Sequence, residues 1–586
     1  MKLDRAGRAL WCLLALGLLA QAALARVPGM WGWGLDALRF VAPPLGLGVW
    51  ALAALALVPP VARAVVPALD RLGRAFESHP APVAFVRAAL AGAFVWLLAD
   101  RVWLVGDFLW RQTALEGPST FANLYPQAFP LDGAIHDRLA RLVMHAGGLD
   151  ANAAGRLLGA LTAAALAVVS IRLTRVLEFQ GVAAVTASAV VYWGGHLTLM
   201  TGYDKSLAEL CVVFVLVAVE AMGLVRAGRG GLLLGAALAL ALLLHRAAVG
   251  LVPGVLAAWG IAFARHRRNA GLRAPGTVVG FALPLIVLVA LAPRLVAIAV
   301  HVDPVHFAPD APGGGALAAL ANPIHLADLV NVVPMLCPLA LALPLVVAVR
   351  RTARREPEFW VLVACAAPFV AVLPVLRPAQ GLFHDWDVFA PGLILVTLVI
   401  AWTLATLVRE RPQLEWLGVS ACAAAIAPML LWLAHFHDLD RGLARVEAYL
   451  AGPPARTTRE VLAAWEFLGF RELDMGRAEE SAAAFARAAS SAPSPRVLRE
   501  WAVAEERRGR PEEARTIYRR LAERDPESVV AWTELVRLAL AAGDLHEARA
   551  AAEAVLRIDP TNASARRLLL ALPADSTMAK PVPGPR

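Results

Sequence analysis

The first 440 residues alternate between long apolar stretches and short polar loops. A hydrocarbon core about 30 Å thick needs roughly 20 apolar residues per helix, and about thirteen stretches approach that length. The pattern predicts an all-α protein whose residues 1–440 form a polytopic transmembrane bundle. The predicted spans lie near residues 9–25, 40–62, 82–99, 153–171, 182–200, 207–224, 231–245, 247–264, 276–296, 329–349, 359–376, 388–408 and 415–435.

Arginines crowd every second loop between these stretches, whereas His and Asp crowd the others. The positive-inside rule makes the arginine side cytoplasmic, which predicts a cytoplasmic amino terminus and an extracytoplasmic carboxyl terminus. The first stretch, which ends at Ala23-Leu24-Ala25, also reads as a cleavable signal peptide. We favour a retained helix, and cleavage would leave the direction of every later span unchanged.

Composition supports a bilayer environment. Hydrophobic residues make up 59% of the chain and charged residues only 17%, with a mean hydropathy of +0.61. The net charge of +9 resides mainly in short loops, so it predicts membrane orientation and no nucleic-acid partner. All five cysteines lie in apolar stretches, where no disulfide framework or metal spacing is readable.

Residues 455–572 carry a period near 34 residues in an amphipathic helical pattern. The repeated positions are those of a tetratricopeptide repeat, in which small residues let paired helices approach and proline ends the second helix. A generic Ala/Arg-rich bundle would explain the helices but not this register. A closing helix is expected at 561–571, and residues 573–586 read as a disordered tail. The register consists of Trp465, Leu498 and Trp532; Gly476, Gly509 and Gly543; Ser481, Ala514 and Ala548; Phe485, Tyr518 and the departing Ala552; and Pro493, Pro526 and Pro560.

The loop at residues 100–152 is long for a membrane connector. From Leu131 onward, Ile135, Leu139, Leu142 and Val143 recur at helical spacing, which predicts a helix along the membrane surface. Alternatively, this helix packs over the transmembrane bundle, and the two roles are compatible.

The segment at about 82–270 resembles the GT-C glycosyltransferases, polytopic enzymes that use polyprenyl-phosphate-linked sugars. An apolar helix leads into Trp103-Leu-Val-Gly-Asp107-Phe-Leu, a long loop follows, and Ala154-Gly155-Arg156-Leu157-Leu158 opens the next span. The resemblance implies that Asp107 is the family's essential acid; the paired acid of many members is absent because Phe108 follows. Joined to the repeats, the chain also resembles the protein O-mannosyltransferases and a set of bacterial proteins with Asp-Trp-Asp in a late loop, here Asp385-Trp386-Asp387.

The chemistry of such a transfer requires one base for the acceptor's proton and stabilisation of a phosphate that is already acidic. One carboxylate is enough, unlike the pair in a glycoside hydrolase. Asp107 is the candidate catalytic base; the alternative is an Asp that caps a helix or pairs with Arg101 or Arg111.

Four cations on the predicted outer face are candidates for binding the lipid phosphate: Lys205, Arg246, Arg111 and Arg377. Pairing of Lys205 with Asp204 and snorkelling of Arg246 are the alternatives. His384, Asp385 and Asp387 are candidate ligands for Mg or Mn, although ordering of their loop explains them equally well. His301, Asp303 and His306 read as a surface loop.

The sequence therefore predicts an inverting membrane glycosyltransferase, located in the cytoplasmic (inner) membrane, that transfers a sugar from a polyprenyl phosphate to a protein or glycan on the extracytoplasmic face. The repeats would present the acceptor. Two alternatives stay open: a non-enzymatic scaffold for envelope assembly, and an enzyme like the O-antigen ligases or polymerases. A transporter is disfavoured because the polar residues cluster in loops rather than in mid-span.

Overall fold

The computed structural model describes residues 5–117, 125–203, 205–307, 316–378 and 380–572. These residues are mostly helical and contain no strand. The chain divides into a membrane unit, Met1–Pro454, and a repeat unit, Ala455–Arg586, each described separately below. The predicted all-α class is confirmed, while the tail at 573–586 lies outside the described residues.

The described residues contain eight helices that are long and apolar enough to cross a membrane. Two more of the predicted spans are helix pairs, and three are apolar helices of 10–17 residues, so a count of thirteen spans is not confirmed. The long helices include α1 (Arg5–Leu24), α4 (Pro80–Leu97), α9 (Ala151–Val176), α11 (Leu207–Ala227), α13 (Val252–His266), α15 (Pro275–His301), α20 (Ala390–Glu410) and α21 (Glu415–His437). The shorter ones are α10 (Gly181–Tyr192), α12 (Gly231–Leu244) and α19 (Pro357–Val372).

Two predicted spans are sharply broken. The helix axis turns by 88° between α2 (Pro43–Ala56) and α3 (Pro59–Ser78), where Pro59 and Pro60 restart the helix, and α3 is strongly amphipathic. A second break of 95° separates α17 (Pro323–Leu336) from the segment Ala340–Val349, which includes α18 (Leu343–Val349). Apolar length alone therefore overestimates how far these two segments cross the membrane.

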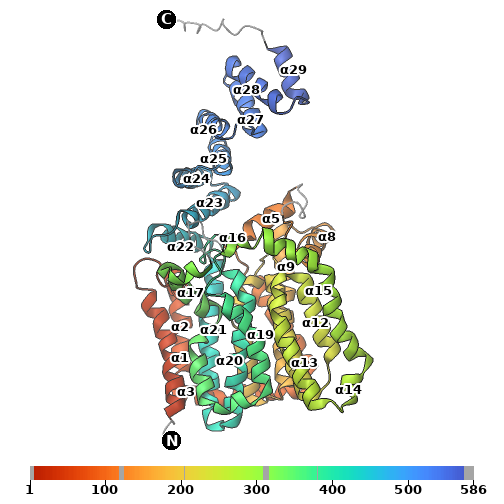
Figure 1. Cartoon of the computed structure of the whole chain (residues 1–586). Coiled ribbons are helices and arrows are strands. Elements are labelled where there is room, and N and C mark those ends of the chain that lie inside the picture. The colour runs from red at the N-terminus through yellow and green to blue at the C-terminus, as the bar shows by residue number, and fades with distance from the viewer. Residues whose placement is uncertain (1–4, 118–124, 204, 308–315, 379, 573–586) are drawn as a thin grey trace. The chain divides into compact units, whose positions relative to one another are not determined.

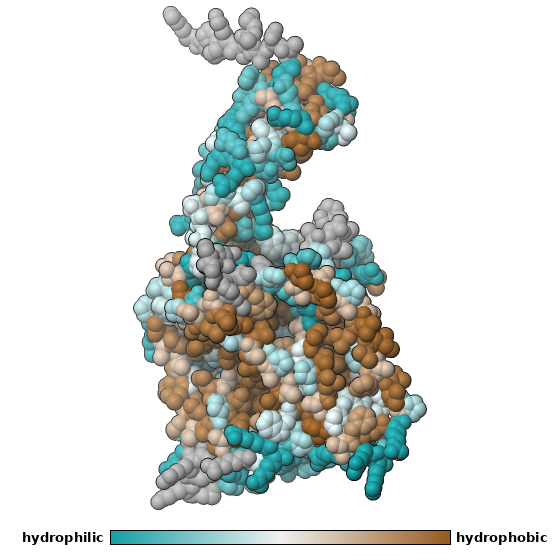
Figure 2. Space-filling view, in the orientation of Figure 1, coloured by the Kyte–Doolittle hydropathy of each residue, from teal (hydrophilic) through white to brown (hydrophobic). Residues whose placement is uncertain are grey.

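Burial separates the centre of the membrane unit from its lipid-facing periphery. Within its most apolar part, the span Trp386–Glu410 is 94% buried, whereas the span Pro275–His301 is only 17% buried. Figure 2 shows hydrophobic side chains in a broad band on the visible face of this unit, with hydrophilic side chains gathered at the end where α14 (Ala270–Arg273) lies. α20 is thus a core helix, and α15 presents its side chains to lipid.

The two ends of the membrane unit carry different elements. α5 (Phe108–Glu116), α8 (Ala140–Gly147) and α16 (Pro304–Phe307) lie at one end, which we call the site end, and α14 lies at the other, which we call the basic end (Figure 1). The chain is helical from Pro130 to Gly147, through α7 (Pro130–Gly133), the π-helical turn Ala134–Leu139 and α8. The helix predicted from Leu131 onward is therefore present.

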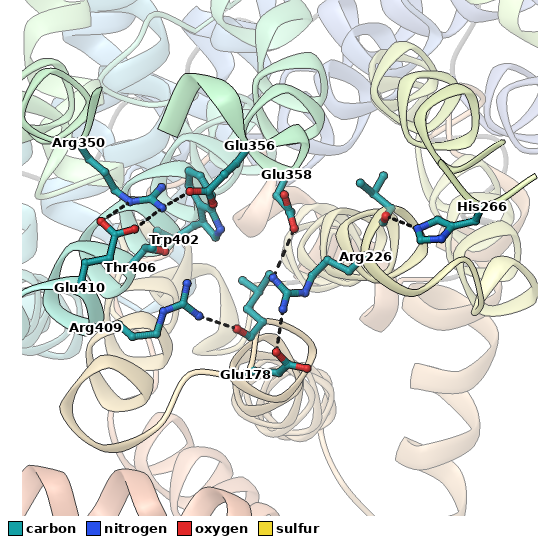
Figure 3. A network of polar contacts seen from close by, with 12 residues as sticks. Glu178, Arg226, His266, Arg350, Glu356, Glu358, Trp402, Thr406, Arg409 and Glu410 are labelled. Atoms are coloured by element: carbon teal, nitrogen blue, oxygen red, sulfur yellow. Dashed lines mark hydrogen bonds and ion pairs between the residues drawn. The ribbon is translucent and has the colours of Figure 1, made fainter. Parts of the chain in front are cut away.

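Ion pairs join several helix ends at the basic end (Figure 3). Arg226 at the end of α11 lies 2.9 Å from Glu178 and 3.4 Å from Glu358, and Arg350 lies 2.9 Å from Glu410. Arg409 donates to the Leu177 carbonyl at the end of α9. The arginine-rich loops predicted to share one side thus meet each other and the intervening glutamates.

α22 (Leu439–Ala451) follows the last span and belongs to the membrane unit. Its Arg445 pairs with Asp36 at 3.7 Å, and its Tyr449 stacks on Phe383 with ring centroids 3.9 Å apart. Phe383 lies directly before the His384 to Asp387 segment, so α22 helps to hold that segment in place.

The repeat unit consists of three helix pairs and a closing helix. Gly476, Gly509 and Gly543 lie in the turns within the pairs with φ between 74° and 79°, a conformation that favours glycine. Phe485 and Tyr518 are buried between the paired helices. The predicted register is confirmed. The pairs are α23 (Thr458–Asp474) with α24 (Ala478–Ser491), α25 (Pro495–Arg507) with α26 (Pro511–Arg524), and α27 (Val529–Ala541) with α28 (Leu545–Ile558); α29 (Ala563–Ala571) closes the unit.

Candidate active site

Asp107 is positioned by a tight turn directly before α5. Gly106 adopts a φ of +54°, and its N–H donates to the His384 carbonyl at 2.8 Å. A Cβ at this position would lie 2.6 Å from Asp387 Oδ2 and 2.9 Å from the Tyr203 hydroxyl, so only glycine fits. The Asp107 side chain makes no capping hydrogen bond to α5, which leaves its carboxylate available to the site.

Lys205 joins two carboxylates that are far apart in sequence. Its Nζ lies 3.2 Å from Asp107 Oδ2 and 3.4 Å from Asp387 Oδ2. Asp387 is fully buried, whereas the Asp107 side chain is 30% exposed. Tyr203 donates its hydroxyl proton to the same Asp387 oxygen. Asp107 is therefore the accessible acid of the cluster, and Asp387 is the internal one.

The charges of this cluster determine its protonation. Lys205 lowers the pKa of Asp107 despite the opposing effect of burial, so this carboxylate is ionised at neutral pH. Burial disfavours the ammonium form of Lys205, but Asp107 and Asp387 together raise its pKa. Burial and the two carboxylates raise the pKa of Tyr203, which keeps its hydroxyl as a donor.

The remaining residues of the late loop face different partners. Asp385 Oδ2 accepts from the Gln380 N–H at 2.8 Å, and burial together with the neighbouring Asp387 raises the pKa of this carboxyl. Burial lowers the pKa of His384 to about 4, so its ring is neutral. These three residues do not form a group that could hold a metal ion, and no other group of His, Cys, Asp or Glu among the described residues does. The Mg or Mn site predicted at His384, Asp385 and Asp387 stays a prediction.

Arg111, a predicted phosphate ligand, lies inside the protein. Its guanidinium nitrogens donate to both carboxylate oxygens of Asp132 at 3.0 and 3.1 Å, and both side chains are only 4% exposed. The guanidinium also stacks on Tyr125, 4.7 Å from the ring centroid. A bidentate pair of this kind anchors the helical segment of the loop at residues 100–152 to α5.

Sequence reasoning missed a polar group beneath this helical segment. His136 Nε2 lies 3.3 Å from Glu209 Oε2, and Glu209 also accepts from the Thr162 hydroxyl at 2.8 Å. The amide of Gln112 is buried and makes no hydrogen bond within the described part of the chain. An available signal was Glu209 itself, because an acid inside an apolar span marks a polar interior.

Arg246 lies at the wall of a separate cavity of about 270 Å³. It pairs with Asp303 at 2.9 Å, and both side chains are about one quarter exposed. The rest of the lining is mostly apolar and comes largely from the end of α19, the residues that follow it and the start of α20. It includes Phe369, Leu373 and Val388, the residue after Asp387. Arg377 is half-buried, and its backbone N–H donates to the His306 carbonyl at 2.8 Å. The structure therefore gathers Asp107, Lys205 and Asp387 in one cluster and places Arg246 at an adjoining apolar cavity.

The fold and the composition define a multi-pass membrane protein with a tetratricopeptide repeat unit. Residues 468–529 and 506–572 match two family models of the tetratricopeptide repeat. No curated protein matches the sequence.

Solved structures resemble the chain at low identity. One is ArnT from Cupriavidus metallidurans bound to undecaprenyl phosphate, with 15% identity and a TM-score of 0.40 over 75% of this chain and 80% of that one. The apo state of the same protein has 16% identity and a TM-score of 0.40 over 76% and 81%. The hetero-tetramer Cut9-Hcn1 has 10% identity and a TM-score of 0.20 over 82% and 98%. TM-scores this low do not establish a shared fold, so the activity has to be argued from the site itself.

Proposed function

We propose that this chain is a membrane glycosyltransferase that transfers a sugar from a polyprenyl phosphate to a hydroxyl group of a protein or glycan. The observation that carries the proposal is an ionised, partly exposed Asp107 held by Lys205, together with an apolar cavity that has Arg246 at its wall and is lined by Val388, the residue after Asp387. A base, two cations and an apolar cavity are the parts that a lipid-phosphate sugar donor requires.

Asp107 acts as the general base. Its carboxylate takes the proton of the acceptor hydroxyl while that oxygen attacks the anomeric carbon, and the bond from this carbon to the phosphate oxygen breaks. The lipid phosphate leaves with the bonding electron pair. The reaction is a single displacement at the anomeric carbon and requires only one carboxylate. It therefore inverts the anomeric configuration.

Lys205 links the base to the leaving group. In the free protein it keeps Asp107 ionised, but the low pKa also makes that carboxylate a weak base. An incoming phosphate competes for the ammonium, and withdrawal of Nζ from Asp107 strengthens the base when the donor is bound. Asp387, which is fully buried, keeps Lys205 in place throughout.

The polyprenyl chain enters the cavity between α19 and α20, and Arg246 binds the phosphate. Its present partner, Asp303, is partly exposed, so solvent weakens the pair and a phosphate can replace the carboxylate. Gln112, whose buried amide makes no hydrogen bond to the described residues, is a candidate for a hydrogen bond to the sugar.

The repeat unit binds the acceptor, since tetratricopeptide repeats form extended concave binding surfaces. The positive-inside rule assigns the basic end to the cytoplasm and the site end to the extracytoplasmic face of the cytoplasmic membrane. α21 ends at the site end, where His437 Nδ1 lies 2.9 Å from the Ala99 carbonyl, so the chain leaves the membrane on the side of the catalytic cluster.

The experiment replaces Asp107 with Asn in the full-length protein and measures sugar transfer from a polyprenyl-phosphate donor. We expect activity to fall by about 10³-fold, because the general base is removed while its shape is kept. Asp137→Asn is the control, since Asp137 lies in the outer-loop helix and pairs only locally with Arg141. Undiminished transfer by D107N would exclude Asp107 as the general base. If D107N also replaces the wild-type protein fully in cells that lack it, a scaffold function would be favoured.

A further inference from the structure

The basic end contains a polar cavity of about 780 Å³ that the proposed reaction does not use. It lies where α9, α11 and α13 end and α19 begins, and part of its wall is seen around Arg226 in Figure 3. The charged residues described in its lining are Arg172, Arg175, Arg226, Arg229, Arg265, Glu178, Glu220 and Glu358.

Each glutamate of this cavity already has an arginine partner. Arg172 Nη2 donates to Glu220 at 2.9 Å, and Arg226 bridges Glu178 and Glu358. Five arginines against three glutamates leave a net charge of two positive on the described lining.

The other three arginines form no hydrogen bond or ion pair through their side chains within the described residues. Arg175, Arg229 and Arg265 are all exposed, and they come from α9, the α11–α12 loop and α13. Topology signals and helix dipoles explain why cations stand at these helix ends. Neither requires three such cations to line the same cavity.

The surroundings of the cavity suggest what binds there. Leu232 is 49% exposed at the start of α12, and Phe263 is 49% exposed in the last turns of α13. Leu232 lies two residues after the lining residue Gly230 and Phe263 two residues before Arg265, so exposed apolar side chains occur at the same helix ends as the cationic cavity. A free anion would use only the guanidinium groups, whereas a lipid would use both features.

We propose that this cavity binds the phosphate headgroup of an anionic phospholipid, with its acyl chains beside α12 and α13. The guanidinium groups of Arg175, Arg229 and Arg265 donate to the phosphate oxygens. The bound lipid connects the ends of α9, α11 and α13. α9 and α11 continue to the site end, where Lys205 lies two residues before the start of α11, so the lipid steadies the helix that follows Lys205. This inference is independent of the proposed transfer reaction.

The test uses the full-length protein in detergent. Addition of phosphatidylglycerol should raise the thermal unfolding midpoint by about 4 °C or more, whereas phosphatidylcholine should not. In the variant R175Q/R229Q/R265Q we expect less than a quarter of this shift and fewer phosphatidylglycerol molecules retained in native mass spectrometry. Because these side chains have no partner in the part of the chain that the structure describes, the midpoint without lipid should stay unchanged.

The control is R267Q/R268Q/R273Q, which removes the same charge from exposed positions of the basic end that do not line the cavity. It should keep the full shift and the retained lipid. Equal loss in both variants would mean that general surface charge binds the lipid, and an undiminished shift in R175Q/R229Q/R265Q would exclude the site. An equal shift with inorganic phosphate alone would overturn the lipid assignment in favour of a free anion.

Discussion

The two ends of the membrane unit use charge in opposite ways. At the site end, Asp107 and Asp387 share the single cation Lys205, and Asp387 is fully buried. At the basic end, arginines outnumber acids in the cavity lining, and some pairs have a strongly exposed member, such as Glu178, whose side chain is 76% exposed. Buried charges are expensive and depend on each partner, whereas exposed pairs contribute little. The comparison shows that the site end depends on a buried cluster with a shared cation, whereas the basic end distributes its charge over many arginines.

The largest expected effect is loss of the shared cation. Lys205→Met leaves two carboxylates without their counter-charge and should lower the free energy of unfolding by about 3–5 kcal/mol. Arg175→Met, the matched change at the basic end, should cost less than about 0.5 kcal/mol. Chemical unfolding in detergent measures both, and similar values for the two variants would break the comparison.

A smaller effect is expected from the turn before Asp107. Gly106→Ala combines left-handed backbone strain with a collision against Asp387 and should cost about 3 kcal/mol in unfolding free energy. Gly148→Ala is the matched control, because Gly148 has a φ of +62° but nothing within 4 Å of the added Cβ, so only about 1 kcal/mol is expected. Equal costs would show that the turn has room to relax.

The pH dependence of stability should single out Asp385. Its pKa is raised by burial, so its contribution is fully present below the unfolded value of about 4 and is lost as the pH rises toward the folded value. Asp385→Asn keeps an acceptor for the Gln380 N–H and should therefore stabilise the protein at pH 8 while changing little at pH 4. Unfolding midpoints across this range test the sign. A stabilisation that grows toward acid pH would contradict it.

The smallest effect belongs to the basic end. Glu178→Gln removes one exposed partner of Arg226 and should change the unfolding free energy by less than about 1 kcal/mol, with the difference vanishing in high salt. A salt-independent loss above that value would mean that the basic end is as tightly coupled as the site end.

Much of the architecture was predictable because its signals are local. The apolar stretches mark the helices of the membrane unit. The helix within the loop at residues 100–152 follows from the spacing of its apolar residues. The repeat unit follows from recurring glycines at positions 476, 509 and 543. Prediction was least accurate where the length of an apolar stretch was the only signal. One span was predicted through Pro59, but the helix axis turns sharply there.

The site was predictable only in part. Its acids and Lys205 were expected on one face, but Arg111 was expected to meet a phosphate and instead holds Asp132, and Arg246 pairs with Asp303. His136 and Glu209 were not singled out, because a lone acid and a lone histidine in separate segments carry no spacing that relates them.

Hydropathy and repeat period thus define the membrane helices, the predicted orientation and the tetratricopeptide register, since each depends on residues within one or two helical turns or one repeat. The meeting of Asp107, Lys205 and Asp387 depends on how three distant segments pack. No local pattern encodes which lysine faces which carboxylate across 182 residues. Packing of the helices around α20 brings them together, and burial then makes their charges matter.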